Sequence, residues 1–397
     1  MGDISTFLDN KRIPLKEDDR KQIKGEYPYY GASGIIDYVN DYIFDEELIL
    51  MGEDGANIVT RSSKLIFLAK GKYWVNNHAH VIKADNNINQ YFLSESLERI
   101  NYEKYNTGTA QPKLNREVCQ KIKVKIPQFN EQNKIANFLL VIDEKLRLLE
   151  QKYQYYQNFK KYLMQQIFTQ KLRFDFKDTW DKVLLKDVAF IPKKTKLTNV
   201  EGLKLLTVKL HTKGIEINDR IKPKLTKRGR PYYIRRSGEL LIGRQNFHNG
   251  GMGIVPKSLD GGICSNAISS FNVFEDKIDV NYLYYFLARP EYYIKSERLI
   301  GGTGQKEFSE KELLKLKIDL PSLEEQNKIV DFLLNIDHKI ELSENQLNKT
   351  QEFKKGLLQQ MFVVRINWRC NFKLAKSPSF NKHLLILKNK IIFIIIK

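Results

Sequence analysis

The sequence predicts an α+β protein made of two copies of one unit, each a strand-rich globular part followed by a long helical part. Residues 127–168 and 321–362 are identical at 22 of 42 positions when they are aligned at a constant offset of 194. A chain of 397 residues is too long for one ordinary domain, and its 42% hydrophobic and 28% charged residues are typical of globular proteins. The globular parts differ from each other much more than the helical parts do.

Both helical parts carry apolar residues in alternating steps of four and three, which is the heptad pattern of a coiled coil. In the first copy these residues are Ile135, Leu139, Ile142, Leu146, Leu149, Tyr153, Tyr156, Leu163 and Ile167. In the second copy they are Ile329, Leu333, Ile336, Ile340, Leu347, Leu357 and Met361. Lys160 interrupts the first series, and Ser343, Thr350 and Lys354 interrupt the second. Two independent amphipathic helices are the alternative, but the regular pattern favours helices that pack on each other.

Short apolar runs between glycine turns predict strands in the globular parts. The expected strands are 49–51, 64–69, 80–83 and 122–126 in the first copy, and 239–243 and 271–274 in the second. Shorter helices are expected near 89–99 and 281–296. Ser322 and Glu325 form a capping-box pattern that marks the start of the second long helix.

The chain is strongly basic, with 66 Lys and Arg against 47 Asp and Glu, a net charge of +19 and a pI near 9.5. This excess favours a polyanionic partner, nucleic acid ahead of a membrane. Residues 363–397 belong to neither copy and carry eight Lys and Arg but no acid. We expect this tail to be a nonfunctional extension; an arm that touches a membrane or nucleic acid is the alternative. The longest apolar run, 391–396, is too short to span a bilayer.

Cysteine usage and motif content argue against a catalytic or metal-binding chain. Cys119, Cys264 and Cys370 are widely spaced, which excludes a disulfide scaffold and suits a reducing cytosol. With no secretory signal at the N-terminus, we expect a cytoplasmic protein. The sequence has no HExxH, no convincing glycine fingerprint after a strand, and no phosphate-loop spacing at 301–306. We therefore predict no catalytic residue, no cofactor and no metal, and a structural role for His78 and His80 rather than metal binding.

Candidate DNA contacts occur in both copies. Residues 220–236 hold eight Lys and Arg and no acid, as phosphate neutralisation requires, and among them we select Lys222, Lys224, Arg228, Arg230 and Arg235. Arg244, Gln245 and Asn246 follow an expected strand end, and such side chains read guanine and adenine edges. The remaining candidates lie in polar or Gly-Thr-rich turns: Asn77, His78, Asn266, Gln111, Gln305 and Lys306. A solvated loop or a structural turn is an equal alternative at each place.

The repeated motifs resemble those of specificity (S) subunits of type I restriction–modification systems. The residues that carry the resemblance are Pro127 with 131–135, Pro321 with 325–329, the IleAsp pairs at 142–143 and 336–337, and the PheLysLys and GlnGln segments that end each helix. Residues 302–306, followed by 315–318, look like the segment that closes a target recognition domain of this family. The resemblance covers about residues 1–362.

The resemblance implies two mixed α/β target recognition domains separated by two long antiparallel coiled-coil helices, with an internal pseudo-two-fold repeat. We expect target recognition domain 1 at 1–126, a central helical spacer at 127–173, target recognition domain 2 at 174–320 and a C-terminal helical spacer at 321–362. The family reads a bipartite double-stranded DNA target, one half with each domain. Its helices dock two modification (methyltransferase) subunits, which use S-adenosylmethionine to methylate adenine, and restriction subunits join them to cleave distant DNA.

One departure concerns the start of the first domain. The second domain opens with a segment from Trp180 to Val188, whereas the first begins at Met1 within the corresponding motif, so we expect an N-terminally truncated first domain. Two rival functions remain open: a self-contained restriction endonuclease, which a nuclease assay on the chain would reveal, and a nonspecific DNA-bridging coiled-coil protein, which competition with random DNA would reveal.

Overall fold

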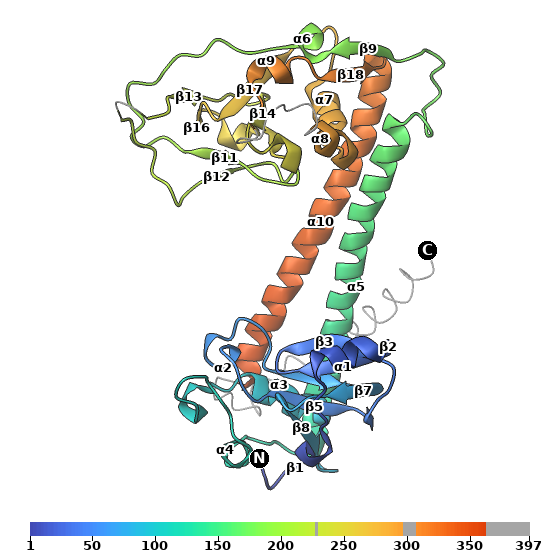
Figure 1. Cartoon of the computed structure of the whole chain (residues 1–397), viewed down its shortest axis with the longest axis vertical. Coiled ribbons are helices and arrows are strands. Elements are labelled where there is room, and N and C mark those ends of the chain that lie inside the picture. The colour runs from blue at the N-terminus through green and yellow to red at the C-terminus, as the bar shows by residue number, and fades with distance from the viewer. Residues whose placement is uncertain (227–228, 297–306, 363–397) are drawn as a thin grey trace, which may run out of the picture. The chain divides into compact units, whose positions relative to one another are not determined.

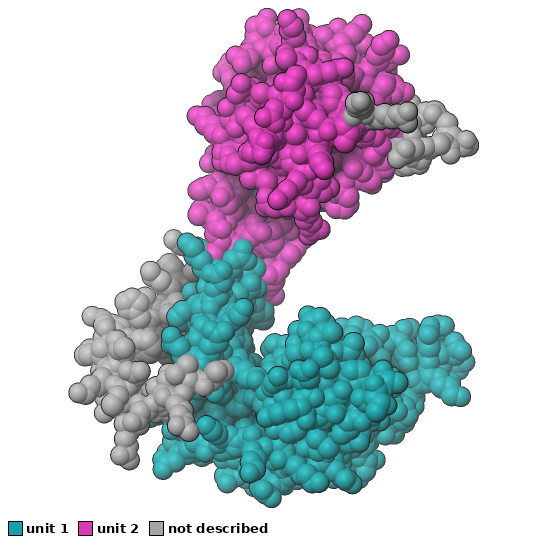
Figure 2. Space-filling model, turned by 90° about the vertical axis from the view of Figure 1, so that its left-hand side faces the viewer, with its two compact units in different colours: residues 1–149, 346–397 teal, residues 150–345 magenta. Residues whose placement is uncertain are grey.

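The computed structural model describes residues 1–226, 229–296 and 307–362 (Figure 1). The chain forms two compact units, which Figure 2 colours separately: unit 1 combines residues 1–149 with 346–397, and unit 2 comprises 150–345. Each unit therefore contains one globular domain and a part of each long helix. The tail at 363–397, which the sequence predicts to be nonfunctional, lies outside the described residues.

Both units contain the same four-stranded antiparallel sheet. Its order is β1-β8-β5-β6 in unit 1 and β10-β17-β14-β15 in unit 2, so the strands follow one another along the chain in the same way. The strands are β1 Ser5–Phe7, β5 Leu48–Gly52, β6 Ile66–Ala69, β8 Ala79–Ala84, β10 Ala189–Phe190, β14 Leu240–Gly243, β15 Met252–Ile254 and β17 Ile268–Val273. The duplication thus extends from the helices into the globular domains.

The two domains differ in what they insert into this shared sheet. Unit 1 inserts a second sheet of order β3-β2-β7-β4, and unit 2 inserts the pairs β11-β12 and β13-β16. The inserted strands are β2 Lys24–Gly31, β3 Gly34–Val39, β4 Phe44–Asp45, β7 Lys72–Val75, β11 Leu206–Val208, β12 Ile215–Ile217, β13 Tyr232–Ile234 and β16 Ile263–Ser265. In both domains the insertions fall between the first and second strands and between the third and fourth strands of the shared sheet, counted along the chain. The two copies therefore share the order of these four strands but differ in the strands inserted between them.

Short helices cover the shared sheets and complete the cores. Ile49, Met51 and Ile82 pack with Leu93 and Leu97 of α3 in unit 1, and α7 is buried in the same way in unit 2. The short helices are α1 Glu17–Gln22, α2 Asn57–Thr60, α3 Gln90–Glu98, α4 Arg116–Gln120, α6 Leu185–Val188, α7 Val280–Leu287, α8 Pro290–Ser296 and α9 Glu310–Leu313. Short 3₁₀ turns add η1 Asp9–Lys11, η2 Glu103–Tyr105, η3 Phe247–Asn249 and η4 Lys257–Leu259. The predicted strands at 49–51 and 80–83 and the helices near 89–99 and 281–296 are confirmed.

The strand predicted at 122–126 is wrong. Its counterpart in unit 2, β18 Lys317–Leu320, pairs with β9 Asp181–Leu184, but no strand of the described chain pairs with residues 122–126. Gly2 N donates to Gln120 O at 2.9 Å, as Lys186 N donates to Leu314 O at 3.0 Å. Met1 and Gly2 therefore hold the places of residues 185 and 186, which follow β9. Since no described strand pairs with residues 122–126, this apolar segment forms no ladder.

The two long helices are α5 Phe129–Phe168 and α10 Leu323–Phe362, each of 40 residues. In unit 1, Ile135, Leu139 and Ile142 cluster with Leu358; in unit 2, residues 163–168 cluster with 329–336. Within each unit the two helix segments run antiparallel and meet along the predicted apolar seam. The predicted fold class of two mixed domains with two long antiparallel coiled-coil helices is confirmed.

Two of the polar residues that interrupt the seam form equivalent ion pairs. Lys354 pairs with Asp143 in unit 1, and Lys160 pairs with Asp337 in unit 2, so the partners match at the repeat offset of 194. In each unit a tyrosine of the domain also donates to the same carboxylate: Tyr91 to Asp143, and Tyr285 to Asp337 at 2.6 Å. Burial, together with the neighbouring aspartate, raises the pKa of both tyrosines, which therefore stay neutral donors. Each interruption thus joins both helices to a domain.

A buried glutamine fixes the start of each long helix to its domain. Gln132 accepts from Asn89 N at 2.8 Å and donates to Pro127 O at 2.9 Å, and Gln326 does the same with Asp279 N and Pro321 O, both at 2.9 Å. The bonds from Asn89 and Asp279 satisfy N–H groups at the starts of the short helices α3 and α7, and the bonds to Pro127 and Pro321 hold the chain just before each long helix. The shared Glu-Gln-Asn-Lys-Ile motif therefore joins helix to domain.

The predicted capping box is only half present. Ser322 Oγ accepts from Glu325 N at 3.4 Å, but the Glu325 carboxylate binds Arg173 at 2.7 Å and Trp180 Nε1 at 3.0 Å instead of its own helix start. The carboxylate thereby ties α10 to the chain that enters the second domain.

Candidate nucleic-acid interface

Four candidate residues of the second domain, Arg244, Gln245, Asn246 and Asn266, lie where β14 ends. Arg244 follows Gly243, and its guanidinium donates to Phe308 O at 3.0 Å and Asn266 O at 3.2 Å and pairs with Glu307 at 2.8 Å. Gln245 Nε2 donates to the same carboxylate at 3.3 Å. The structure therefore brings Arg244, Gln245 and Asn266 together, but it uses most of the Arg244 donors inside the domain.

Asn246 is more exposed than Arg244 and Gln245. Its side chain is exposed at the start of η3 and makes no capping hydrogen bond there. Its backbone holds the turn, since Gly251 N donates to Asn246 O at 2.8 Å. Asn246 thus presents an exposed amide beside a fixed backbone, the arrangement that bidentate contact with a base edge requires.

The basic segment divides into exposed and buried members. Lys222, Lys224 and Arg230 are exposed, and Arg228 lies outside the described residues. Arg235 is 1% exposed: its guanidinium donates to Ile268 O at 3.0 Å and lies 5.7 Å from the Tyr233 ring centroid. It is therefore unavailable to DNA in this structure, because it directly follows β13 and its side chain turns into the domain.

The candidates of the first domain gather at the end of β5, the strand that matches β14. His78 is exposed and lies 2.7 Å from Asp54, and Asn77 is exposed next to it. Gln111 is exposed in a tight turn, in which a Cβ added at Gly108 would lie 1.8 Å from the Gln111 carbonyl oxygen. That turn is fixed to the strand end, since Gly55 N donates to Pro112 O at 3.0 Å. Gln305, which matches Gln111 at the repeat offset, and Lys306 lie outside the described residues.

Sequence reasoning missed the charged residues that hold these turns. Glu53 lies 2.7 Å from Arg12 and 3.4 Å from Lys113, and Glu307 binds Arg244. A signal was available, because Lys113 and Glu307 match at the repeat offset of 194. The two residues carry opposite charges, however, so the alignment of the copies shows no identity there.

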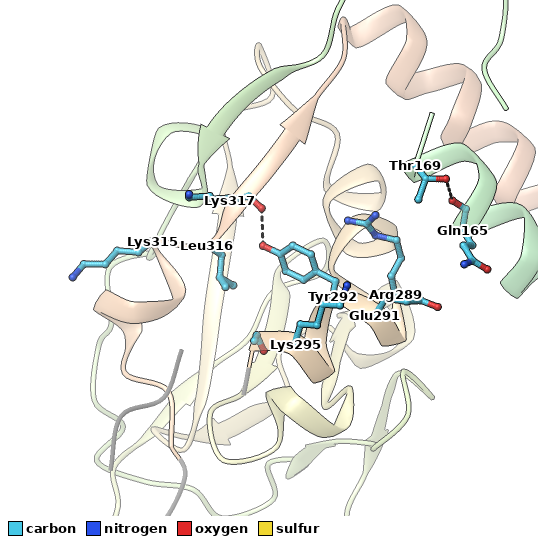
Figure 3. Close-up of a pocket in the computed structure, with 10 residues that line it drawn as sticks. Gln165, Thr169, Arg289, Glu291, Tyr292, Lys295, Lys315, Leu316 and Lys317 are labelled. Atoms are coloured by element: carbon cyan, nitrogen blue, oxygen red, sulfur yellow. Dashed lines mark hydrogen bonds between the residues drawn. The ribbon is translucent and has the colours of Figure 1, made fainter. Parts of the chain in front are cut away.

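A separate hollow of about 650 Å³ lies in unit 2 beside α8 (Figure 3). Arg289, Lys295, Lys315 and Lys317 lie around it, and Tyr292 closes one side by donating to Lys317 O at 2.6 Å. Glu291 is the one acid among its described lining residues. The described lining of the hollow is therefore predominantly basic.

Two other kinds of site are absent from the described residues. Among residues 1–226, 229–296 and 307–362, no three His, Cys, Asp or Glu side chains gather closely enough to hold a metal ion. In the same part of the chain, neither of the long helices nor any shorter one has the apolar length that crossing a bilayer requires.

Comparison with known proteins finds a family match in both copies. Residues 1–155 and 177–352 match the family described as "Type I restriction modification DNA specificity domain". A putative type I restriction enzyme specificity subunit of Haemophilus influenzae is 34% identical over 139 residues, 35% of this chain and 35% of that relative. The type I restriction enzyme MjaVIII specificity subunit of Methanocaldococcus jannaschii is 24% identical over an alignment that covers 92% of each chain.

The whole fold resembles that of a solved structure. The solved structure is the S subunit of a type I restriction–modification system from M. genitalium, with a TM-score of 0.62 and 15% identity, and the match covers 91% of this chain and 96% of that one. At that identity the likeness supports the fold.

Proposed function

Because this chain belongs to the type I restriction–modification DNA specificity family, we propose that it reads a bipartite DNA target, one half with each globular domain. The observation that supports this most is the shared four-stranded sheet with different insertions in the two domains. In this proposal both recognition surfaces lie on equal frames, and the residues that differ between the domains read different bases. The chain is a non-catalytic recognition component, like the specificity subunits that it resembles.

We assign the parts of the chain accordingly. Residues 1–126 and 174–320 are the two target recognition domains, and residues 127–173 and 321–362 are the helical spacers between and after them. Base reading depends on side chains that project from fixed turns, so we place it at the ends of β5 and β14. Phosphate contact depends on exposed cations and is assigned to the basic segment before β13.

Exposure and pairing sort the candidate residues within this proposal. Asn246, Asn77, His78 and Gln111 are exposed at the two strand ends and are proposed to face bases, and Lys222, Lys224 and Arg230 are proposed to face phosphates. Arg244 binds the Asn266 carbonyl and shares the Glu307 carboxylate with Gln245, so these three candidates support the strand end. Arg228, Gln305 and Lys306 remain candidates on sequence grounds alone, and buried Arg235 is left out.

The repeated helices are proposed to dock two copies of the modification subunit, with restriction subunits joining them in the cytoplasm. Leu140 and Leu334 match at the repeat offset and are 45% and 44% exposed, although the seam residues beside them are buried. An exposed leucine at the same position of both helix copies contributes to neither hydrophobic core. It is therefore suited to contact with a partner that binds each helix copy in the same way.

The proposal is tested by selection of bound DNA from a random library. The full chain is purified in complex with the modification subunit of its own system and incubated with random duplexes. We expect enrichment of two short motifs separated by an unspecified spacer of fixed length. Enrichment of no motif, or of one continuous motif, would contradict bipartite reading, and cleavage by the chain alone would favour the endonuclease alternative.

A further inference from the structure

Glu53 and Arg244 occupy the same place in the two domains. Each directly follows the glycine that ends its strand, β5 or β14. Each backbone N–H donates to the neighbouring loop, Glu53 to His78 O at 2.9 Å and Arg244 to Ala267 O at 3.1 Å. Each carbonyl accepts from the closing segment, which here means residues 106–114 in the first domain and residues 307–308 in the second: the donors are Leu114 N at 2.7 Å and Phe308 N at 3.0 Å. Because 114 and 308 differ by the repeat offset, the equivalence of 53 and 244 is set by the backbone and not by side-chain likeness.

In the first domain, the residue before Leu114 is a cation that meets an anion. Lys113 Nζ lies 3.4 Å from Glu53 Oε1, with the lysine 46% and the glutamate 13% exposed. Arg12 holds the other Glu53 oxygen at 2.7 Å, and His80 lies 3.7 Å away. The position of the Glu53 carboxylate is therefore fixed by contacts other than the one with Lys113.

In the second domain, the same two places hold the opposite charges. Glu307, which precedes Phe308, lies 2.8 Å from Arg244 Nη2, and the two side chains are 27% and 25% exposed. The Arg244 guanidinium is also fixed, through its bonds to the Phe308 and Asn266 carbonyls. Each domain thus has one anchored charge at the strand end and one opposite charge on the closing segment, but the polarity is reversed between domains.

We infer that Lys113 and Glu307 are positioning residues, which hold the closing segment of each domain against its strand end and so set how that domain meets its half-site. This inference rests on the proposed function. In the first domain the held segment includes the Gly108 turn and exposed Gln111, because Thr107 N donates to Lys113 O at 2.8 Å and Asn106 Oδ1 accepts from Lys113 N at 2.8 Å. The reversed polarity makes each attachment specific to its own domain. If the closing segments were exchanged, Lys113 would meet Arg244 and Glu307 would meet Glu53, and like charges repel.

The test reverses one charge at a time in the full complex. Lys113→Glu places two carboxylates together in the first domain, and Glu307→Lys places two cations together in the second. Lys113→Arg keeps the charge, and Lys121→Glu makes the same charge change at an exposed site outside the closing segment. Binding is measured on three duplexes: the selected target and two variants with one half-site scrambled.

Lys113→Glu is expected to reduce discrimination at one half-site by roughly fivefold or more, and Glu307→Lys to reduce it at the other. Lys113→Arg and Lys121→Glu should leave both ratios at the wild-type value. Amide exchange should rise in residues 106–113 of Lys113→Glu, although its thermal unfolding midpoint stays close to that of Lys121→Glu. Faster exchange with unchanged discrimination, or equal loss at both half-sites, would overturn the inference while leaving bipartite reading intact. A wild-type complex with no half-site preference would instead contradict the proposed function.

Discussion

His80 forms a buried ion pair whose effect depends on pH. It is 1% exposed on β8, with Nδ1 2.7 Å from Asp9 Oδ2 and Nε2 2.8 Å from Leu114 O, so both ring nitrogens donate when the ring is protonated. Burial alone lowers the pKa of His80, but the hydrogen bond to Asp9 and the charge of that carboxylate oppose it, and the pKa is raised to about 10. The same pair outweighs the effect of burial on Asp9 and lowers the pKa of its carboxyl group.

The folded pKa of His80 lies above the ordinary value of about 6.5. The protonated ring therefore contributes its full stabilisation below about pH 6.5. This contribution is lost as the pH rises through the folded value near 10. We therefore expect the unfolding free energy of the unit that contains His80 to fall between about pH 6.5 and 10, and His80→Gln to flatten that fall. Calorimetry across this range measures it. His78→Gln is the matched control, because His78 is 51% exposed; equal flattening in both variants would contradict the role of the buried pair.

Substitutions at two residues of the second domain should distinguish contact with a base from contact with a phosphate. Asn246→Ala should reduce discrimination between the target and single-base variants by about 1–3 kcal/mol, with little change on random DNA. Lys222→Ala should weaken binding to every duplex and reduce the slope of log affinity against log salt by about 1. Titrations at several salt concentrations measure both. An equal loss on target and random DNA for Asn246→Ala would reject its assignment to a base.

Residue type and local sequence predict which regions are candidates for DNA binding. They do not predict which side chains in those regions are exposed and available. Lys222 and Arg235 belong to one basic run, yet one is exposed and the other is buried beside Tyr233. The carbonyl that binds Arg235 belongs to Ile268, 33 residues along the chain. Arg244 has the side chain of a base reader, but Glu307 and two carbonyls surround it. Such partners come from tertiary contacts, which a run of charges in one sequence does not reveal.

At the scale of elements, the ion pairs between the long helices should stabilise each unit measurably. Lys354 is 13% exposed and pairs with Asp143, which also accepts from Tyr91. Lys354→Met leaves that carboxylate without its cation and should lower the unfolding free energy by about 1–2 kcal/mol. Neighbouring Lys355 is exposed, and Lys355→Met should change it by less than about 0.5 kcal/mol. Denaturant unfolding compares the two, and equal effects would show that the pair contributes nothing specific.

The outward-facing leucines should control how many modification subunits bind. Leu140→Asp should remove one of two subunits, and Leu334→Asp the other, so each single variant should bind one copy and the double variant none. Tyr155→Asp is the control, since Tyr155 is 61% exposed on the same helix but its repeat partner is Lys349. Mass measurement of the purified complexes gives the stoichiometry. Two copies bound to the double variant would place the docking surface elsewhere.

The elements themselves are largely predictable, because their periodicity is local. The heptad spacing predicts both long helices, and short apolar runs predict β5, β8 and β14. Residues 122–126 have the same apolar pattern as β18 but form no strand, because a strand exists only with a neighbour to pair with. The interruptions at Lys160 and Lys354 look like weak points of the seam in the sequence, although each is an ion pair to the other helix.

At the scale of the whole molecule, duplication explains why the same contacts recur in both units. One offset of 194 relates the helices, the glutamines that start them, the ion pairs and the closing segments. That offset is visible in the amino-acid sequence alone. The DNA sequence that is read is not predictable in this way, because base readout depends on docking geometry and on the shape of the DNA.

The central claim is that each domain reads its own half-site. It is tested most directly by mapping methylated sites across a genome in cells that supply the modification subunit. The wild-type chain is compared with a chimera in which residues 174–320 are replaced by the same domain of a relative. We expect a bipartite motif for both proteins, with one half changed in the chimera and the other half identical. A chimera in which both halves change, or an unchanged motif, would contradict modular recognition.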